Sequence, residues 1–457
     1  MESLAVIAIF DIGKTNKKLL LFDEYYQLVF EENIRLPEIT DEDGFPCEDI
    51  LALTKWIREK FSIIIQDDRY EIKAVNISGY GASFVYLDEQ GTVMLPVYNY
   101  LKPFPEALLE KFYKDYGGES QVCRQTASPA LGSLNSGLQL YRIKYEKPDI
   151  FKKIKFALHL PQYLSSVLSG SFNAEITSIG CHTHLWDFEK NQYHSWVIHE
   201  RLDVKFPLIR NAGEIAGLYK GRIKVGIGLH DSSAALIPYI SSFSEPFVLL
   251  STGTWCISLN PFNHDELTNE ELQHDCLCYL SFQGIQVKAS RLFAGYEHEQ
   301  QAKRIADYFK MPIDHYSTIK YRKSVMTSLR NHGENRNAQG QDPKNKAILF
   351  SSRNLDSFNN YSEAYHQLVD DIISQQVNST RLVLGKAKRI FVDGGFSRNP
   401  VFMNLLAEAF PNLEVYAASL SQASAIGAAF VIHEQWNEKA KPSDIIEMQL
   451  LKNAIIK

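Results

Sequence analysis

The stretch that most constrains the fold of this chain is residues 6–23, in which two apolar runs flank a short polar loop. Apolar runs of this length around a loop that contains glycine predict a strand, a turn and a second strand. Asp11 ends the first run, and Gly13 lets the backbone come close to a ligand. The donors that follow are Thr15, Asn16 and Lys18. This composition favours a phosphate site in which the carboxylate holds Mg²⁺ through water, and an ordinary polar hairpin is the alternative.

The same loop contains a sequence that imitates the end of a P-loop, Gly13-Lys14-Thr15. A P-loop also needs a glycine five residues before the lysine, with a loop between the two. Here an apolar strand, residues 8–10, occupies those positions. The sequence therefore excludes a P-loop NTPase.

Length and composition limit the classes of protein that fit. A chain of 457 residues is long enough for two or three domains, and a net charge of −6 argues against nucleic acid or an anionic membrane as a partner. The six cysteines lack the spacing of a disulfide framework or a zinc site, which favours reduced thiols. No apolar run is long enough to span a membrane, and the N-terminus reads as a strand and not as a signal peptide, so we expect a cytoplasmic protein.

A second pattern of strand, turn and strand, at residues 247–259, repeats the first one further along the chain. The repetition predicts a duplicated fold whose boundary lies near residues 241–245. We therefore expect an N-terminal domain at residues 1–242 and a C-terminal domain at residues 243–457.

Local signals predict several further elements. Apolar periodicity indicates helices at residues 50–65, 160–169 and 422–432, and Gly170 is suited to cap the second of these. A hairpin is expected at residues 84–93, with Gly91 in its turn. The polar stretch 331–346 is expected to be a surface loop.

Five motifs, taken together, resemble the FGGY family of carbohydrate kinases. They stand in the family's order, with its spacing, over residues 5–432. The motifs are Asp11-x-Gly13-x-Thr15, Gly228-x-His230-Asp231, Ser251-Thr252-Gly253-Thr254-Trp255, Val392-Asp393-Gly394-Gly395 with Ser397-Arg398-Asn399, and Ala425-x-Gly427-Ala428-Ala429. The resemblance implies an α/β fold of two ribonuclease H-like domains, of the actin/Hsp70 ATPase type, with a cleft between them.

Within the family the chain is most similar to the L-rhamnulokinase branch, on residues 80–84, 135–140 and 175–185. It departs from the family pattern at three places. Ser83 stands where an aspartate is expected, and Lys14 stands where a threonine is usual. The Asp-x-Arg expected in residues 98–103 is absent. All three departures lie at positions that the resemblance assigns to the sugar or to the first phosphate loop.

The resemblance implies ATP and Mg²⁺ as cofactors and gives roles to particular residues. Asp231 is the expected general base. The sequence itself agrees, because Asp231 follows a glycine-bounded loop and precedes a helix of small residues. The alternative role for Asp231 is to cap that helix. His230 is expected to be structural, and Asp11 to position the metal. The expected phosphate and nucleotide residues are Gly13, Thr15, Asn16, Lys18, Gly253, Thr254, Gly394, Gly395 and Asn399. Trp255 is expected in the core, and Gly427 is expected to pack a helix against a sheet near the adenosine.

For the sugar we expect a pocket with an aromatic face and several hydrogen-bonding side chains. The candidates are Gly79, Tyr80, Ser83, Gln139, Glu175, His184 and Asp231. His182 and His184 could instead form a metal pair, but no carboxylate-rich cluster accompanies them, and alternate residues of a strand share a face without being ligands.

The expected function is therefore an ATP-dependent kinase that transfers the γ-phosphate to a hydroxyl of a ketose similar to L-rhamnulose, giving the 1-phosphate. A non-catalytic nucleotide or sugar sensor on the same fold, or a degenerate kinase, is the alternative. We expect a small sugar as the partner, and a homodimer is one open possibility for the assembly.

Overall fold

The structure is a computed structural model that describes residues 3–331 and 349–451. The chain divides into two compact units, and each is composed of several segments. The first unit comprises Met1–Ser242, Cys278–Gln286 and Ser421–Ile445. The second comprises Phe243–Leu277, Val287–Leu420 and Ile446–Lys457. The first point of division follows residue 242, while the segment at residues 421–445, which lies inside the domain expected at residues 243–457, packs with the first unit.

The main sheet of the first unit has two parallel strands, β1 and β6, at its centre. In spatial order its strands are β13 (Ile215–Tyr219), β14 (Ile223–Gly226), β6 (Tyr70–Gly79), β1 (Leu4–Ile12), β2 (Lys17–Asp23) and β3 (Leu28–Ile34), and β15 (Leu229–His230) also pairs with β6. β1 and β2 form the antiparallel hairpin that the apolar runs predict, so that prediction is confirmed.

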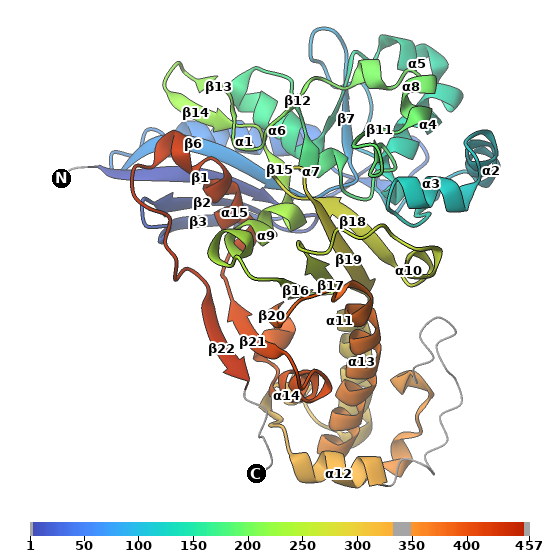
Figure 1. Cartoon of the computed structure of the whole chain (residues 1–457). Helices are drawn as coiled ribbons and strands as arrows, with labels where there is room; N and C mark the ends of the chain where they lie inside the picture. The colour runs from blue at the N-terminus through green and yellow to red at the C-terminus, as the bar shows by residue number, and fades with distance from the viewer. Residues whose placement is uncertain (1–2, 332–348, 452–457) are drawn as a thin grey trace. The chain divides into compact units, whose positions relative to one another are not determined.

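Helices cover both faces of this sheet, as Figure 1 shows. The helices on one face are α1 (Ile50–Ile64) and α6 (Leu160–Ser169), and those on the other are α9 (Asp231–Ser242) and α15 (Ala423–Val431). Asp49 caps the start of α1 by accepting from the Ala52 N–H, and Gly170 ends α6 with a φ of 72°, as its position in the sequence predicts.

Gly427 lies where α15 crosses α9. A Cβ atom at this position would collide with the carbonyl oxygen of Ala234, so only glycine lets the two helices approach so closely. As expected, the helix that carries Gly427 packs on a sheet, because α15 contacts β1 and β6, and its place near the adenosine stays a prediction. The neighbour that requires the glycine is a helix, and both helices belong to the first unit.

The strand at residues 84–87 finds a distant partner. β7 (Phe84–Leu87) pairs with β8 (Phe156–His159), whereas Val93 makes only an isolated bridge to Leu87. The turn around Gly91 and an antiparallel bridge from Leu87 to Val93 are present, so the hairpin expected at residues 84–93 is confirmed in a short form, and the main strand partner of β7 is β8.

The remaining elements of the first unit are short. The helices are α2 (Glu106–Asp115), α3 (Glu119–Gln125), α4 (Ser136–Glu146), α5 (Pro148–Lys153), α7 (Ile176–Ile179), α8 (Ser195–His199) and α16 (His433–Trp436). The strands are β4 (Ile39–Thr40), β5 (Pro46–Cys47), β9 (Ala174–Glu175), β10 (Trp186–Asp187), β11 (Gln192–Tyr193) and β12 (Ile209–Arg210).

The second unit repeats the strand pairing of the first. In spatial order its sheet contains β19 (Gln286–Leu292), β17 (Cys256–Asn260), β16 (Phe247–Thr252), β20 (Arg389–Gly394), β21 (Glu414–Ser419) and β22 (Glu447–Leu451). β16 is antiparallel to β17 and parallel to β20, just as β1 is antiparallel to β2 and parallel to β6. The second hairpin predicted from the sequence is thus confirmed. β18 (Cys276–Leu280) leads along the chain from the second unit into the first.

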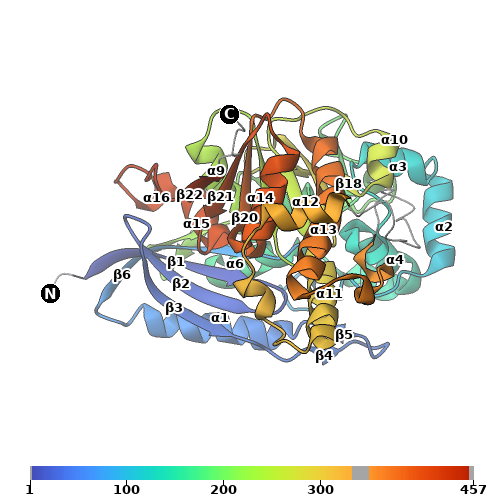
Figure 2. The same cartoon turned by 90° about the horizontal axis from the view of Figure 1, so that it is seen from below.

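Helices of the second unit gather around its longest member, α13 (Figure 2). The gathered helices are α11 (Ala294–Phe309), α12 (Lys323–Asn331) and α14 (Pro400–Ala409), around α13 (Tyr361–Val383). α10 (Asn269–Gln273) is a short helix elsewhere in this unit. The first turn of α10 is fixed by a capping box between Thr268 and Glu271. Apart from Asn331, the loop expected at residues 331–346 lies outside the described residues.

From composition we expected reduced cysteines and no segment that spans a membrane. All six cysteines are buried. Within residues 3–331 and 349–451, no helix has both the length and the apolar character needed to cross a membrane.

Candidate functional site

Two carboxylates, Asp11 and Asp231, form the centre of the candidate site in the first unit. Asp11 lies near the end of β1, and Asp231 begins α9 directly after β15. Burial and the neighbouring charge of Asp231 together raise the pKa of Asp11 to about 6. The Ser424 hydroxyl donates to Asp11 Oδ2 at 3.0 Å and partly opposes this rise. A place where two carboxylates disfavour each other's charge is a place where a cation is favourable.

Asp231 is held by the first turn of its own helix. The Ser232 N–H donates to Asp231 Oδ1 at 2.6 Å, and 31% of the Asp231 side chain remains exposed. The protein around the rest of the side chain raises the pKa of Asp231 to about 6 by desolvation. The carboxylate is therefore ionised at neutral pH and close to its protonation point, which suits a proton acceptor.

His230 is a neutral neighbour of this carboxylate. Its Nε2 lies 3.3 Å from Asp231 Oδ1, and burial lowers the pKa of His230 to about 4. A Cβ at Gly81 would come within 2.9 Å of the same ring nitrogen, so a glycine there leaves room for the imidazole. These contacts fit a structural role for His230.

The loop after β1 is a tight turn with exposed polar groups. The Gly13 N–H donates to the Asn16 carbonyl at 3.0 Å, and the side chains of Thr15 and Asn16 are exposed. Lys18 lies opposite Asp11 in the register of the hairpin, and its charge lowers the pKa of Asp11. The arrangement offers exposed donors and a cation beside a carboxylate, which is what a phosphate chain with Mg²⁺ requires.

A buried ion pair lies beneath this loop. Lys17 Nζ lies 3.0 Å from Glu48 and also donates to the Lys14 carbonyl at 2.9 Å, and only 1% of Lys17 is exposed. The same Glu48 accepts from the Tyr80 hydroxyl at 3.0 Å. The pair thus ties the loop to Tyr80, one of the residues expected at the sugar. Sequence reasoning missed Lys17, although alternation along β2 gives it the same face as the buried Leu19.

The residues expected at the sugar on β6 and just after it are tightly packed. Gly79 pairs with His230 across β6 and β15, and a Cβ there would come within 3.0 Å of Pro161. Tyr80 is 6% exposed, and its ring lies 6.3 Å from that of Tyr100. Burial raises the pKa of Tyr100, and the charge of Asp231 adds to the rise. Ser83 is buried. The structure thus brings Gly79 next to the His230–Asp231 dipeptide.

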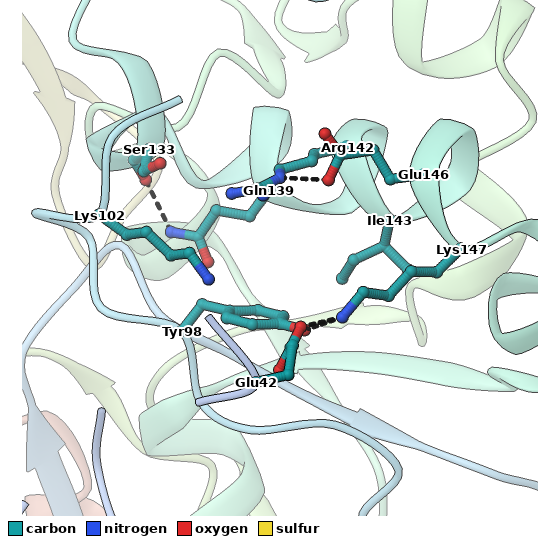
Figure 3. Close-up of a pocket in the computed structure, with 9 residues that line it drawn as sticks. All are labelled: Glu42, Tyr98, Lys102, Ser133, Gln139, Arg142, Ile143, Glu146 and Lys147. Carbon is teal, nitrogen blue, oxygen red and sulfur yellow. Dashed lines mark hydrogen bonds and ion pairs between the residues drawn. The ribbon is translucent and has the colours of Figure 1, made fainter. Parts of the chain in front are cut away.

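Gln139 lies at a separate small cavity of about 20 Å³, shown in Figure 3. Its Nε2 donates to the carbonyls of Ala82 and Ser133, at 2.8 and 2.6 Å. Its Oε1 is buried without a hydrogen-bond partner. A cavity of this size has room for about one water molecule and not for a sugar ring.

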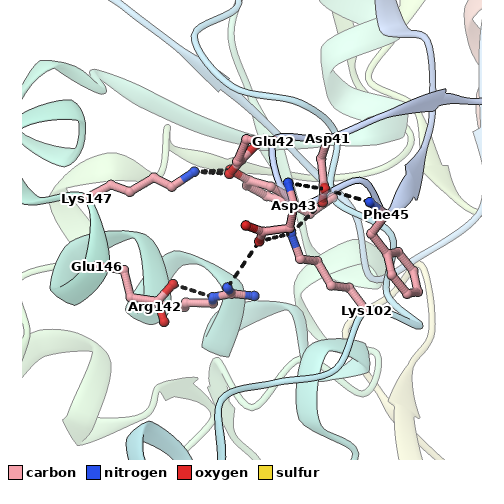
Figure 4. A network of polar contacts seen from close by, with 9 residues as sticks. Asp41, Glu42, Asp43, Phe45, Lys102, Arg142, Glu146 and Lys147 are labelled. Carbon is pink, nitrogen blue, oxygen red and sulfur yellow. Dashed lines mark hydrogen bonds and ion pairs between the residues drawn. The ribbon is translucent and has the colours of Figure 1, made fainter.

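Ion pairs close the walls of that cavity, as Figure 4 shows. Lys102 is 7% exposed and contacts Asp41 at 2.5 Å and Asp43 at 2.7 Å. Arg142 contacts Glu146 at 2.6 Å. Glu42 and Lys147 form a further ion pair in the same network. The network joins the loop after β4 to α4, at the place where the Asp-x-Arg of the family is absent from residues 98–103.

Glu175 and His184 are buried in protein contacts. Glu175 is 0% exposed and caps α7, accepting from the Thr177 N–H at 2.9 Å and the Ser178 N–H at 3.2 Å. His184 has protein partners on both ring nitrogens, Nδ1 with Thr126 at 2.7 Å and Nε2 with a tyrosine hydroxyl at 3.3 Å. The polar atoms of both side chains are bonded to protein groups in this arrangement. The place of Glu175 and His184 at the sugar stays a prediction.

In the second unit, Gly253 and Thr254 form the turn between β16 and β17. The Gly253 N–H donates to the Trp255 carbonyl at 2.9 Å, and a Cβ at Gly295 would collide with the Gly253 carbonyl. Trp255 is 41% exposed, so the expectation that it lies in the core is wrong. It ends the turn and stacks near Phe293, with ring centroids 4.5 Å apart, because the turn directs it away from the sheet.

A cavity of about 850 Å³ opens next to this turn, and it is large enough for a nucleotide. Gly253, Thr254, Gly395 and Asn399 all line it. A Cβ at Gly395 would meet no atom within 4 Å, so the missing side chain leaves cavity space against the backbone. Gly394, by contrast, has a φ of 90° and a Cβ there would collide with the Thr252 carbonyl, so this glycine is required by the fold.

The side chain of Asn399 is already engaged. Its Oδ1 caps α14 by accepting from the N–H groups of Val401 and Phe402, and its Nδ2 donates to the Tyr365 hydroxyl at 2.8 Å. The Tyr365 hydroxyl is also 2.9 Å from His298 Nε2. Asn399 thus shapes the wall of the cavity, and a direct contact of its amide with adenosine stays a prediction.

Comparison with known proteins decides the family. Residues 6–239 match the FGGY family of carbohydrate kinases, N-terminal domain. This match covers half of the chain and includes Asp11, Gly79 and Asp231. The chain belongs to the FGGY family of carbohydrate kinases.

Relatives of this FGGY protein have known names and structures. Over 266 residues it is 26% identical to a rhamnulokinase of Mannheimia succiniciproducens, a match that covers 55% of this chain and 52% of the relative. It is 20% identical to an L-fuculokinase of Haemophilus influenzae, over 93% of this chain and 94% of the relative. A crystal structure of a carbohydrate kinase from Novosphingobium aromaticivorans superposes with a TM-score of 0.80 at 22% identity, over 98% of this chain and 94% of that one. The chain spans about half the length of the rhamnulokinases it matches.

The structural match confirms the predicted α/β fold of two actin-like domains. Two residues of this FGGY protein near the two carboxylates were given no role from the sequence. They are Thr177, which bonds the His230 N–H, and Ser424, which bonds Asp11. Ser424 lies 413 residues from the Asp11 that it contacts, and no local pattern signals such a pairing. Among the described residues there is no group of three or more histidine, cysteine or acidic side chains that could hold a metal ion.

Proposed function

We propose that this protein is an ATP-dependent sugar kinase in which Asp231 is the general base. The observation that carries the proposal is the placement of Asp231 at the start of α9, with a pKa of about 6 and an exposed part of its carboxylate. A base of this pKa is ionised at neutral pH and can take the proton of a sugar hydroxyl as the phosphoryl group is transferred. His230, with its pKa lowered to about 4, stays neutral and does not compete with the carboxylate for charge.

Asp11 fits a role beside Mg²⁺. Burial and the charge of the nearby Asp231 together raise the pKa of Asp11, and a divalent cation would favour its ionised form against both. Mg²⁺ is commonly held by one or two carboxylates together with substrate phosphates, so the absence of a larger cluster among the described residues is compatible with it. Bound Mg²⁺ supplies neutralisation of the charge on the phosphates.

The cavity of the second unit fits ATP, which kinases of this family use. Its volume of about 850 Å³ suits a nucleotide, and at Gly395 the backbone itself forms part of the wall. Gly253 and Thr254 present a turn to the same space, with Thr254 available to donate its hydroxyl to a phosphate. We assign the adenosine and the phosphates to this cavity and its turn.

For the acceptor we propose a ketose similar to L-rhamnulose, phosphorylated at the 1-hydroxyl. The support is the likeness to proteins named rhamnulokinase and L-fuculokinase, at 26% and 20% identity. Tyr80, Ser83 and Gly79 lie at or next to the strand that carries the site, and the altered residues Ser83 and Lys14 set this chain apart from the family pattern. A cytoplasmic location and a homodimer complete the proposal.

The test is ADP release from Mg-ATP with a panel of ketoses, aldoses and polyols that includes L-rhamnulose, L-fuculose, the xyluloses and the ribuloses. We expect one ketose to raise turnover far above the rate without sugar, and NMR of the product to place the phosphate on carbon 1. A phosphate on another carbon would remove the 1-phosphate from the proposal. A flat panel, with nucleotide binding shown separately by calorimetry, would favour a sensor or a degenerate kinase.

A further inference from the structure

A chain of hydrogen bonds leads from the buried Glu175 to the backbone beside Asp231. The Thr177 hydroxyl donates to Glu175 Oε2 at 2.6 Å. The oxygen of the same hydroxyl accepts from the His230 N–H at 3.0 Å. His230 directly precedes Asp231, so two hydrogen bonds separate the Glu175 carboxylate from the peptide that carries the proposed base.

The geometry makes the direction of this chain specific. Because the Thr177 hydroxyl has one proton and gives it to Glu175, its lone pairs remain for the His230 N–H. Glu175 and Thr177 are both 0% exposed, so water does not replace either bond in the folded protein. Glu175 itself is anchored by the N–H groups of Thr177 and Ser178, which fix it at the start of α7.

The segment that carries His230 has anchors besides Thr177. Gly228, two residues earlier, donates its N–H to Asn76 Oδ1 at 3.1 Å, and its carbonyl accepts from Gln162 Nε2 at 2.7 Å. β15 is only two residues long, and it pairs with β6 through Leu229 and His230 alone. The imidazole of His230 adds a 3.3 Å contact to Ser233, one turn into α9. The hydrogen bond that the His230 N–H donates to Thr177 is the contact nearest to the point at which β15 ends and α9 begins, and it helps to set that point. That position determines where the Asp231 carboxylate points.

We infer that Glu175 and Thr177 are positioning residues, which hold the His230 backbone and through it the carboxylate of Asp231. This inference rests on the proposed function of Asp231 as the base. It gives Glu175 a different task from the sugar contact expected from the sequence. The hydrogen bonds place Glu175 one step behind the site and leave it no contact with the acceptor.

Thr177→Val tests the inference, because valine keeps the branched shape and removes the hydroxyl. We expect kcat to fall by about 10- to 100-fold, as for other small displacements of a catalytic group, while KM for ATP stays within about twofold. Thr177→Ser restores the hydroxyl and is expected to recover most of kcat. Glu175→Gln is a second, independent break, because glutamine has one acceptor oxygen where the two oxygens of the carboxylate accept three hydrogen bonds.

Thr183→Val is the matched control. Thr183 is 1% exposed, and its hydroxyl makes two hydrogen bonds, as that of Thr177 does. It donates to the Ile179 carbonyl at 2.6 Å and accepts from the Leu185 N–H at 3.1 Å. It has no bond to β15. We expect this variant to lose stability to a similar degree as Thr177→Val but to keep kcat within about threefold of the wild type.

Amide hydrogen exchange at His230 gives a readout that does not depend on turnover. We expect faster exchange of this amide in Thr177→Val and in Glu175→Gln, and an unchanged rate in Thr183→Val. Unchanged exchange in Thr177→Val, or a serine variant as impaired as the valine variant, would overturn the inference. A wild-type protein without sugar-dependent turnover would refute the proposed kinase, while the exchange data would still decide whether Thr177 holds the peptide.

Discussion

The replacement Asp231→Asn separates the chemistry of the base from its structural role. Asparagine has the same size and keeps an Oδ1 that can accept from the Ser232 N–H, at the 2.6 Å seen for aspartate. It cannot accept a proton from a sugar hydroxyl. General-base catalysis contributes roughly 10²–10⁴ in rate, so we expect kcat to fall by about that factor while nucleotide binding is retained.

The same replacement is expected to stabilise the protein at neutral pH. The fold raises the pKa of Asp231 from 3.8 to about 6, so it favours the protonated carboxyl. This favourable contribution is present below pH 3.8 and is lost as the pH rises through 6. Above pH 6 the ionised group costs the fold up to about 3 kcal/mol, from 1.36 kcal/mol per pKa unit. Because 31% of the side chain is exposed, we expect a measured gain of about 1–2 kcal/mol for the neutral asparagine.

Two measurements check this pair of effects. Steady-state ADP release with the best sugar of the panel gives kcat, and urea unfolding at pH 7.5 and pH 4 gives the free energy of unfolding. The stabilisation should appear at pH 7.5 and vanish near pH 4, where the wild-type carboxyl is already protonated. Turnover close to that of the wild type would refute the assignment of the base. A variant less stable than the wild type at pH 7.5 would refute the account of the raised pKa.

Two further predictions concern glycines and the buried ion pair. Gly394→Ala is expected to destabilise the second unit by about 1–3 kcal/mol. Gly395→Ala should leave the melting temperature unchanged but weaken the binding of ADP, measured by calorimetry. Equal effects of the two variants would contradict the cavity assignment. Lys17→Met leaves Glu48 buried without its cation and should cost about 3–5 kcal/mol in urea unfolding, and adding Glu48→Gln should recover part of that loss. No recovery in the double variant would show that packing, not charge, dominates there.

Local patterns predicted what depends on local physics. Two continuous apolar runs predicted the hairpin of β1 and β2, because strands buried on both faces need such runs. Gly170 predicted the end of α6, because only a residue that tolerates positive φ suits that position. The repeated pattern of strand, turn and strand predicted the duplicated fold. None of these predictions needs to know which distant segment lies nearby.

Contacts between distant segments could not be predicted in this way. The pairing of β7 with β8 and the bond from Ser424 to Asp11 join residues that no local pattern relates. Trp255 was expected in the core from its type, but the direction of a turn sets its exposure. The role of Glu175 depends on which N–H groups surround its carboxylate, and one sequence does not contain that information.

The first unit is completed only by a segment near the end of the chain. α15, at Ala423–Val431, packs against α9 at Gly427 and supplies the serine that contacts Asp11. During synthesis at about 5–20 residues per second, the ribosome needs about 10–40 s to go from residue 242 to residue 445. During that time α15 has not yet been synthesised, so the face of the sheet that it covers lacks this helix. We therefore expect the first unit to complete its fold only after residues 421–445 have been synthesised.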